Sequence, residues 1–512
     1  MLLELGQLGS GGVVYDIKPY DLPPNVFNKT LNVEFDGFSA KPMVEEVGLL
    51  TPLPDTVEAI ALHQGYVFGN LAVWVAGAAD RLFILFKDIW FDITPDGLRS
   101  VKHWNLFSYN GYVICHSEEN APYYVDIHDW LAPAKEVPNW PANVRCRHLG
   151  GFSGFLVGLG LSSSDGFFDR QLVFWSDLAE SGSLPSNFNF SDPASRAGFV
   201  TLEGEEDFIT GLPLGNSYII YRSKSIYSMR FIGGVSVFAF ERRDKNTRLL
   251  NRDSVCEIDG MHFFLGKDSF YFYDGIQKVP VGKGQVSDTL FKTWNEDTVR
   301  VYPDPDNLKL WIYYSIGNEV FGMCFRYKQS FFFPRSFDSI LAIGSGQIFD
   351  PDEIDLWTDW SMSWLELDKT WELVYENEDL NRLVYATDTG FVTVPKTGLF
   401  KEAFLERTCL AFLGTDQANT ITINRTVRKV IREVWPEMDF GKVVIQMGYA
   451  ETALENPTYA VGKVFDASLS LKQDWIYSTK YPAFRISNLI NGSAVDFSLT
   501  GFGIEVEFGG RY

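Results

Sequence analysis

Short apolar stretches alternate with polar turns along most of the chain, and the pattern repeats. Each copy has an apolar strand, a lysine-containing turn and a second strand that opens with an aliphatic or aromatic residue, as in residues 86–91, 222–229 and 266–273. A glycine often introduces the strand before such a turn, with Gly215 as a looser copy of Gly65, Gly111, Gly154 and Gly260. Taken in chain order, these five glycines are 46, 43, 61 and 45 residues apart.

A period of roughly 40–50 residues built from short strands predicts propeller blades of four strands each. A solenoid of helices would need apolar residues at a spacing of about 3.6, which these segments lack. We therefore expect an all-β protein whose body, residues 61–410, is a β-propeller of about six blades.

The two ends of the chain follow other patterns. Residues 1–60 are interrupted by proline and glycine, and residues 13–17 and 31–35 read as short extended segments, which predicts an extended N-terminal arm laid over the body. Longer segments with partial alternation fill residues 411–512, most clearly at 495–508. This pattern predicts a C-terminal antiparallel β domain of sandwich-like form.

Composition supports a folded and acidic protein. Apolar residues make up 46% and aromatic residues 15% of the 512 positions, which argues against disorder and favours cores built from strands. The formal net charge is −22, from 44 basic and 66 acidic residues. Such a charge disfavours binding of nucleic acid through its phosphates and suits a surface along which DNA slides without sticking.

The cysteines give no sign of a disulfide framework or a cofactor. They are odd in number and form no C-x-x-C pair, at positions 115, 146, 256, 324 and 409, so we expect reduced thiols. Cys115-His116 together with Cys146-Arg147-His148 is the one arrangement that hints at a metal. Because neighbouring side chains on a strand point to opposite faces, we expect no zinc there, no other metal and no cofactor.

Nothing predicts a membrane span or a secretory signal. The longest uncharged apolar run, residues 71–79, is too short to cross a bilayer. The first residues lack the basic region of a signal peptide. A cytosolic site of synthesis follows.

Catalytic motifs are missing from the sequence. There is no G-x-S-x-G, H-E-x-x-H or P-loop. Residues 158–160 and 344–346 are glycine pairs without a third glycine, residues 163–166 resemble a sialidase-type turn only superficially, and Trp175-Ser176-Asp177 occurs once. We expect no enzyme, although a carboxylate pair of the glycosidase kind stays open among 66 acids.

Several segments resemble one family. The opening residues 11–25, which end in Tyr20-Asp21-Leu22-Pro23-Pro24-Asn25, and residues 31–35 are similar to the start of tail proteins from short-tailed bacteriophages, with Phe27 where tryptophan is usual. Further similarity falls on the interior and the end of the chain, at residues 173–178, 211–229, 259–275, 502–506 and 510–511. The resemblance is to the tail nozzle protein, also called the packaged-DNA stabilisation or tail tubular B-type protein.

Membership of that family would imply a propeller body with added β domains, in a hexameric ring beneath the portal and adaptor rings of the virion tail. The expected partners are further copies of the chain, the adaptor or head-completion protein, a tail fibre or tailspike, and double-stranded DNA that passes without specific binding. Assembly would take place in the host cytoplasm. The family carries no catalytic residues.

Two functions follow from this reading. The first is a structural nozzle subunit that retains packaged DNA and forms the channel for its ejection. The alternative is a soluble propeller enzyme or carbohydrate-binding module that acts on host-surface glycan. Under the first reading the proline-rich arm drapes onto a partner, and the expected interface residues are Tyr15, Asp16, Tyr20, Asp21, Pro23 and Pro24.

Overall fold

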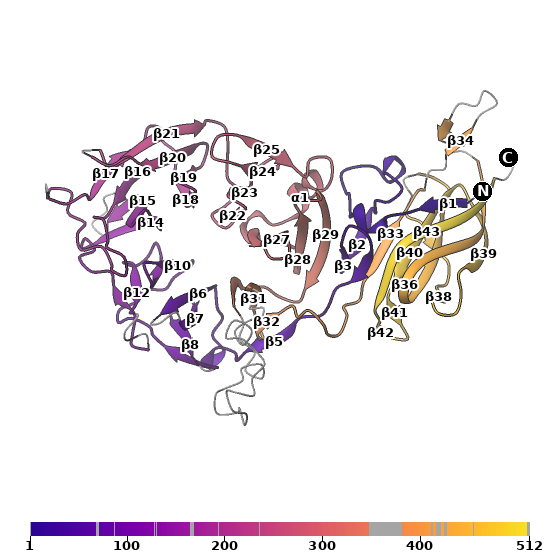
Figure 1. Cartoon of the computed structure of the whole chain (residues 1–512), viewed down its shortest axis with the longest axis horizontal. Coiled ribbons are helices and arrows are strands. Elements are labelled where there is room, and N and C mark those ends of the chain that lie inside the picture. Colours follow the sequence, from indigo (N-terminus) through magenta and orange to yellow (C-terminus); the bar gives the residue numbers. More distant parts are fainter. Residues whose placement is uncertain are drawn as a thin grey trace, which may run out of the picture.

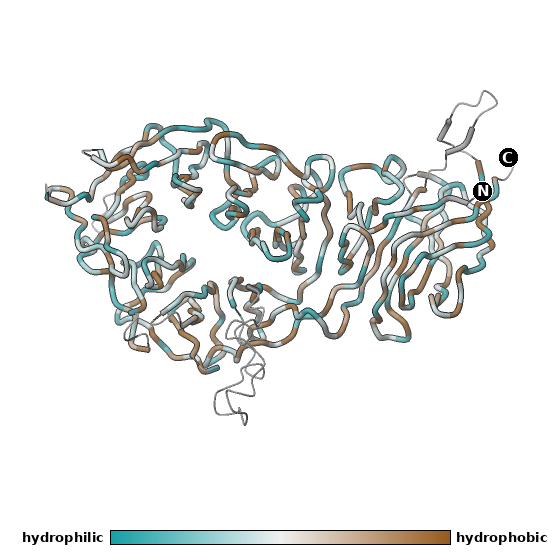
Figure 2. The backbone as a smooth tube through the Cα atoms, in the orientation of Figure 1, coloured by the Kyte–Doolittle hydropathy of each residue, from teal (hydrophilic) through white to brown (hydrophobic). Residues whose placement is uncertain are grey.

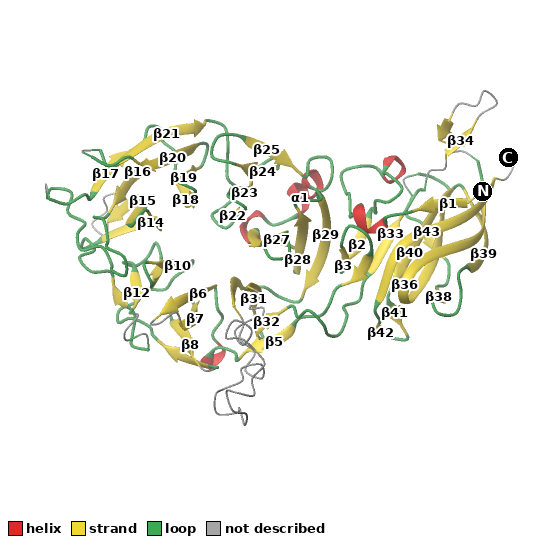
Figure 3. Ribbon diagram, viewed as in Figure 1, coloured by secondary structure: helices red, strands yellow, loops and turns green. Residues whose placement is uncertain are grey.

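The computed structural model contains two β bodies that lie side by side, a ring of small sheets and a separate large sheet (Figure 1). It describes residues 2–67, 71–86, 88–126, 129, 131–163, 168–192, 194–234, 236–347, 381–410, 413–415, 421–423, 427–453 and 455–508. Helix is scarce in this part of the chain (Figure 3), with one α-helix, α1 (Ser287–Thr293), and the 3-10 turns η1 (Leu8–Ser10), η2 (Pro19–Asp21), η3 (Pro54–Thr56) and η4 (Glu296–Thr298). The prediction of an all-β protein is confirmed.

The ring is a β-propeller of seven four-stranded antiparallel sheets. The first blade consists of β6 (Ala61–Val67), β7 (Leu71–Gly77), β8 (Leu82–Phe86) and β9 (Ile89–Asp92). The second consists of β10 (Asn105–Tyr109), β11 (Tyr112–His116), β12 (Tyr123–Val125) and β13 (Lys135–Glu136). The third consists of β14 (Val144–Phe152), β15 (Phe155–Ser163), β16 (Phe168–Trp175) and β17 (Gly198–Thr201). The next three are β18 (Phe208–Leu214), β19 (Ser217–Arg222), β20 (Ile226–Phe231) and β21 (Phe238–Asp244), then β22 (Val255–Ile258), β23 (Met261–Leu265), β24 (Phe270–Tyr273) and β25 (Lys278–Val281), then β26 (Arg300–Asp304), β27 (Lys309–Ile316), β28 (Glu319–Arg326) and β29 (Phe331–Phe337).

The seventh blade corrects the expected count of about six. Its inner three strands are β30 (Ala342–Gln347), β31 (Asn381–Thr387) and β32 (Gly390–Thr393), and its outer strand is β5 (Val47–Leu50) from near the N-terminus. The count was wrong because this blade is assembled from two distant parts of the chain, which a search for a sequential repeat does not join. Ring closure by a strand from the other end leaves no open edge between the first and last blades.

The repeated glycines have a geometric cause. Gly111, Gly154 and Gly260 are the second residues of two-residue turns between the first and second strands of their blades. Both turn residues adopt positive φ, as at Asn110 (48°) and Gly111 (88°), which is the geometry of the type I′ hairpin turn and favours Asn-Gly. Gly65 differs, because it lies within β6, where an added Cβ would meet Val113.

The antiparallel strand order gives the propeller two distinct faces. Turns between strands one and two, and between strands three and four, lie at one end of each blade; we call this the hairpin face. Turns between strands two and three, and the connections to the next blade, lie at the opposite end; we call this the mouth face.

The second body is an 11-stranded antiparallel sheet that uses both ends of the chain. Its strands are β1 (Leu2–Leu5), β2 (Lys29–Leu31), β3 (Val33–Phe35), β4 (Ala40–Pro42), β33 (Phe404–Arg407), β36 (Lys429–Ala450), β37 (Thr458–Tyr459), β38 (Lys463–Asp466), β39 (Gln473–Thr479), β40 (Tyr481–Ser487) and β43 (Phe497–Phe508). The short pairs β34 (Leu413–Thr415) with β35 (Ile421–Ile423) and β41 (Leu489–Ile490) with β42 (Ser493–Ala494) stand apart from it. Apolar residues recur along its strands, as they do in the blades (Figure 2).

Strand β36 folds back on itself and so gives this body two layers. Its first half pairs with β39 and β43, and its second half pairs with β38, β37 and β40. Its two ends approach each other, because Lys429 pairs with Thr479 while Ala450 pairs with Tyr481. Register shifts near Met438 and the positive φ of Gly441 (98°) lie at the bend, as expected where a strand passes between layers.

The N-terminal segment is not an arm laid over the body, which corrects that expectation. Strands β1 to β4 are part of the large sheet and β5 completes the seventh blade. Leu5, Phe27 and Phe35 are fully buried in one core with Phe333 of blade six and Phe484 of the large sheet. The prolines and glycines serve to turn the chain between these short strands.

Buried histidines connect neighbouring blades. Four of them bond a group on the next blade: His63 with Ser108 (3.0 Å), His116 with the Cys146 carbonyl (3.1 Å), His148 with the Tyr218 hydroxyl (3.1 Å) and His262 with the Pro213 carbonyl (2.9 Å). His262 donates from Nε2 to that carbonyl, so its Nδ1 accepts from the Tyr221 hydroxyl at 2.9 Å. Burial lowers the pKa of all four rings, which favours the neutral imidazole.

These histidines predict a loss of stability in mild acid. Burial lowers the pKa of His116 to about 3 and that of His262 to about 4, whereas unfolded histidine titrates near 6.5. Below pH 6.5 the unfolded chain binds protons that the folded chain does not. The free energy of unfolding should thus fall as pH drops from 6.5 toward 4, by up to about 1.4 kcal/mol per pH unit for each fully buried histidine.

Urea titrations at intervals between pH 7.5 and 5 measure this slope. The variant His262→Gln keeps a donor and an acceptor but does not titrate, so its curve should be flatter by the contribution of one histidine. A His262→Gln curve parallel to that of the unaltered protein would contradict the assignment.

Candidate functional site

The predicted interface residues Tyr15 and Asp16 make contacts within the chain. The Asp16 carboxylate accepts hydrogen bonds from the backbone N–H groups of Asp288 (3.1 Å) and Thr289 (2.8 Å) at the start of α1, where a carboxylate is favoured by the unpaired N–H groups. The N–H groups of Tyr15 and Asp16 both donate to the Gln285 carbonyl. Burial raises the pKa of Tyr15 above its usual range.

The other four predicted residues lie on a loop held by a buried arginine. Arg407 is 2% exposed and donates to the carbonyls of Pro19 (2.6 Å), Leu22 (2.8 Å) and Pro23 (3.5 Å). Burial lowers its pKa to about 10. Tyr20 is half-buried beneath Lys18, whereas Asp21, Pro23 and Pro24 are exposed. Their role in a partner interface stays a prediction.

The arrangement that hinted at a metal consists of two close groups. Cys146 Sγ lies 3.3 Å from His116 Nε2, and that nitrogen donates to the Cys146 carbonyl. His148 points instead to Tyr218. Within the described ranges no three histidine, cysteine or acidic side chains form a metal-binding group. All five cysteines are buried.

A cavity of about 430 Å³ opens on the mouth face of the propeller. Connections that lead into successive blades line it: His103 before β10, Asp207 before β18, residues 248–253 before β22 and Asp297 before β26, with Arg147 of β14. We call this the mouth cavity. Sequence reasoning missed it, because its residues come from four separate connections and strand β14, with no shared motif.

Several charged or titratable groups of the mouth cavity contact one another. Asp207 lies 3.7 Å from Arg147 and 3.5 Å from Arg170, and Asp253 lies 3.7 Å from His103. Burial lowers the pKa of His103, and the Asp253 carboxylate opposes that shift. The cavity can hold a small polar molecule, but it shows no nucleophile with an adjacent base.

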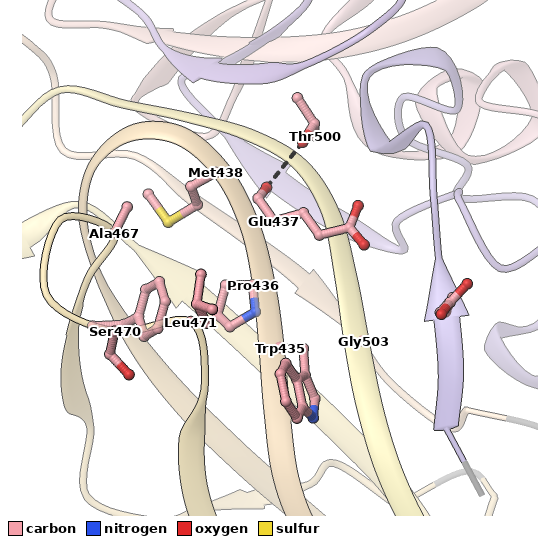
Figure 4. Close-up of a pocket in the computed structure, with 11 residues that line it drawn as sticks. Trp435, Pro436, Glu437, Met438, Ala467, Ser470, Leu471, Thr500 and Gly503 are labelled. Carbon is pink, nitrogen blue, oxygen red and sulfur yellow. Dashed lines mark hydrogen bonds between the residues drawn. The ribbon is translucent and has the colours of Figure 1, made fainter.

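A second hollow, of about 420 Å³, lies at the bend of β36 in the large sheet. Trp435, Pro436 and Met438 of β36 face Ser470 and Leu471 of the loop between β38 and β39 across it (Figure 4). Thr500 of β43 donates to the Glu437 carbonyl at its rim (3.1 Å). Its lining is mainly apolar and contains no catalytic arrangement.

The strands beside this hollow carry exposed aliphatic side chains. Residues 461–476, which we call the apolar edge, include Val461 (89% exposed), Leu469 (82%), Leu471 (79%) and Ile476 (79%). Phe465 and Trp475 of the same strands point into the core. In the described part of the chain, β38 and β39 pair with β36 alone. The outer faces of these strands therefore expose Val464 and Ile476 beside polar residues, whereas their inner faces are buried.

None of the helices in the described part of the chain is long and apolar enough to cross a bilayer.

Comparisons with known proteins concern the fold. No family model matches the chain, and no curated protein matches it. Similar solved structures include the computationally designed protein Ika8 (12% identity, 68% of this chain and 99% of that chain, TM-score 0.35) and a catalytically inactive virginiamycin B lyase from Staphylococcus aureus with quinupristin (8%, 68% and 97%, 0.37). A third is YCF48 with a bound peptide (10%, 62% and 93%, 0.33). The seven sheets themselves define the class, a seven-bladed β-propeller with an added antiparallel β body.

Arg407 should be a major determinant of stability. In Arg407→Met the carbonyls of Pro19 and Leu22 lose their donor in a buried setting, which should lower the free energy of unfolding by about 2–4 kcal/mol. Arg432, which contacts Glu507 at the surface, gives the matched control Arg432→Met, expected to change stability by less than about 0.5 kcal/mol. Urea unfolding compares the two, and equal effects would refute the anchoring role.

Proposed function

We propose that the protein is a structural subunit of the tail nozzle of a short-tailed bacteriophage. It assembles as a hexameric ring in the host cytoplasm and remains in the virion tail with the adaptor protein and a tail fibre or tailspike. The ring retains packaged DNA and forms its exit channel. The proposal assigns the protein no catalytic activity.

The observation that carries the proposal is the apolar edge. Five aliphatic residues, Val461, Val464, Leu469, Leu471 and Ile476, are between 52% and 89% exposed within one short stretch. A group of strongly exposed aliphatic residues on a folded protein is typical of a site for a macromolecular partner. It supports a protein that works in an assembly more than an enzyme that works alone.

The charges agree with a conduit for DNA. Each phosphate that a lysine or arginine neutralises adds favourable counterion release and would slow the exit of DNA. Here basic residues are offset by nearby acids, since Arg242 contacts Glu206 (3.0 Å) and Arg243 contacts Glu241 (2.9 Å). The net charge of −22 leaves an excess of acids over the whole chain.

The alternative, a propeller that acts on glycan, has the mouth cavity in its favour. That cavity lies where loops of several blades converge, as ligand sites in rings often do. However, its lining contains no phenylalanine, tyrosine or tryptophan, and its charged groups include arginine–aspartate contacts. The mouth cavity therefore favours a structural role for these pairs, and the nozzle proposal is the stronger one.

Assembly of the purified protein tests the proposal. We expect particles of about six subunits in mass photometry, either at micromolar concentration or after addition of the adaptor protein, because the apolar edge is covered only in an assembly. A strictly monomeric protein under both conditions would overturn the proposal.

DNA binding provides a second test. Filter binding at low salt should show no tight, salt-sensitive complex between the assembled ring and double-stranded DNA, because an acidic lumen releases few counterions. Tight binding that weakens steeply with added salt would contradict the role of a sliding conduit.

A further inference from the structure

The exposed apolar residues of the propeller lie on one face. On the hairpin face, six blades each carry at least one: Ile89 (60%), Leu131 (39%), Phe199 (56%), Ile232 (56%), Ile276 (73%) and Leu308 (46%). Val47 (41%) adds the seventh blade. Among the described residues of the blades, Ile316 (38%) is the one large exposed hydrophobic residue at the mouth face.

The hairpin face is also acidic. The turns on this face carry exposed acidic residues in five blades, at Asp88, Asp129, Glu180, Asp274 and Asp306. The exposed basic residues in the same described turns are Arg196 and Lys328, and Lys328 contacts Asp259 at 2.6 Å. Turns on the mouth face also carry exposed carboxylates, at Asp80, Asp268, Glu319 and Asp388, but this face in addition combines arginines and aspartates in contacts around its cavity.

The apolar edge of the large sheet complements this face in both respects. It carries five exposed aliphatic residues. Of the three lysines in residues 461–480, Lys472 and Lys480 contact Glu433 and Glu451 of the same chain, so Lys463 is the one that faces a neighbouring copy. The Lys463 ammonium reaches the Asp474 carbonyl (2.8 Å) and lies 4.4 Å from the centre of the Trp475 ring. Neither contact supplies a compensating carboxylate.

We propose that the hairpin face of one copy receives the apolar edge of the next copy. This inference rests on the proposed ring, since it names the two surfaces that join its subunits. The two surfaces belong to different bodies of the same chain, so the contact is head-to-tail, and such a contact closes into a ring when its rotation fits. Burial of aliphatic side chains drives the contact, and Lys463 together with the carboxylates of the hairpin face sets its register.

Engineered cysteine pairs test the contact, because all five native cysteines are buried. Ser470→Cys places a thiol on the apolar edge, and Gln277→Cys places one on the hairpin face of blade five, both at exposed positions. A short bismaleimide should link this double variant into a ladder of covalent multimers. The matched control pairs Ser470→Cys with Lys267→Cys, which is exposed on the same blade at the mouth face, and should give no ladder.

Substitutions give an independent readout. Ile276→Asp should weaken assembly at least tenfold in mass photometry, whereas Ile316→Asp, on the mouth face, should leave it unchanged. This inference is overturned if the protein assembles but the control pair also gives a ladder, or if Ile276→Asp and Ile316→Asp weaken assembly equally. Either result leaves the ring proposal standing. Protein that is monomeric throughout overturns both.

Discussion

The rest of the structure depends on the way residues 29–50 join the two β bodies. This stretch pairs with β33, contributes β3 and β4 to the large sheet, and ends as the outer strand of the seventh blade. Two partly buried carboxylates fix it to blade six. Glu34 contacts Lys309 (2.8 Å) and Arg326 (2.7 Å), and Glu46 contacts Arg335 and Lys401 (2.9 Å each).

These ion pairs hold residues 29–50 firmly against blade six, because water has little access to them. The two cations beside Glu34 hold its pKa below the ordinary value although burial acts in the opposite direction. Removing one partner of a buried pair leaves a charge without compensation, which costs more than the pair itself contributes. The ring therefore cannot close without placing the large sheet, and the orientation of the apolar edge follows from that placement.

Local chemistry explains which parts of the fold were readable from the sequence. Asn110-Gly111 and Asp259-Gly260 predict hairpin turns, because Asn, Asp and Gly readily adopt the positive φ that such a turn requires at two successive residues. Long-range pairing left no such mark. Val47 pairs with Thr393, so the seventh blade was invisible to a repeat search, and prolines near it suggested an arm. The bend in β36 depends on register shifts that only its partner strands define.

The candidate surfaces likewise include features that the sequence predicts and features that only the fold reveals. The Tyr20–Pro24 motif was readable, but its contacts with Arg407 needed the fold. The sequence does not distinguish Leu469, Leu471 and Ile476 from core residues. The structure shows them exposed, because Phe465 and Trp475 already occupy the inner face of this region. Likewise the two faces of the propeller emerge only when turns from seven blades are grouped by the end at which they lie.

The most direct test of the account is a cryo-electron microscopy reconstruction of the assembled particle at side-chain resolution. We predict a closed ring in which Leu469 and Ile476 of each subunit are buried against the hairpin face of its neighbour, near Ile276. A particle in which residues 461–476 remain in solvent, or in which subunits join through their mouth faces, would contradict it.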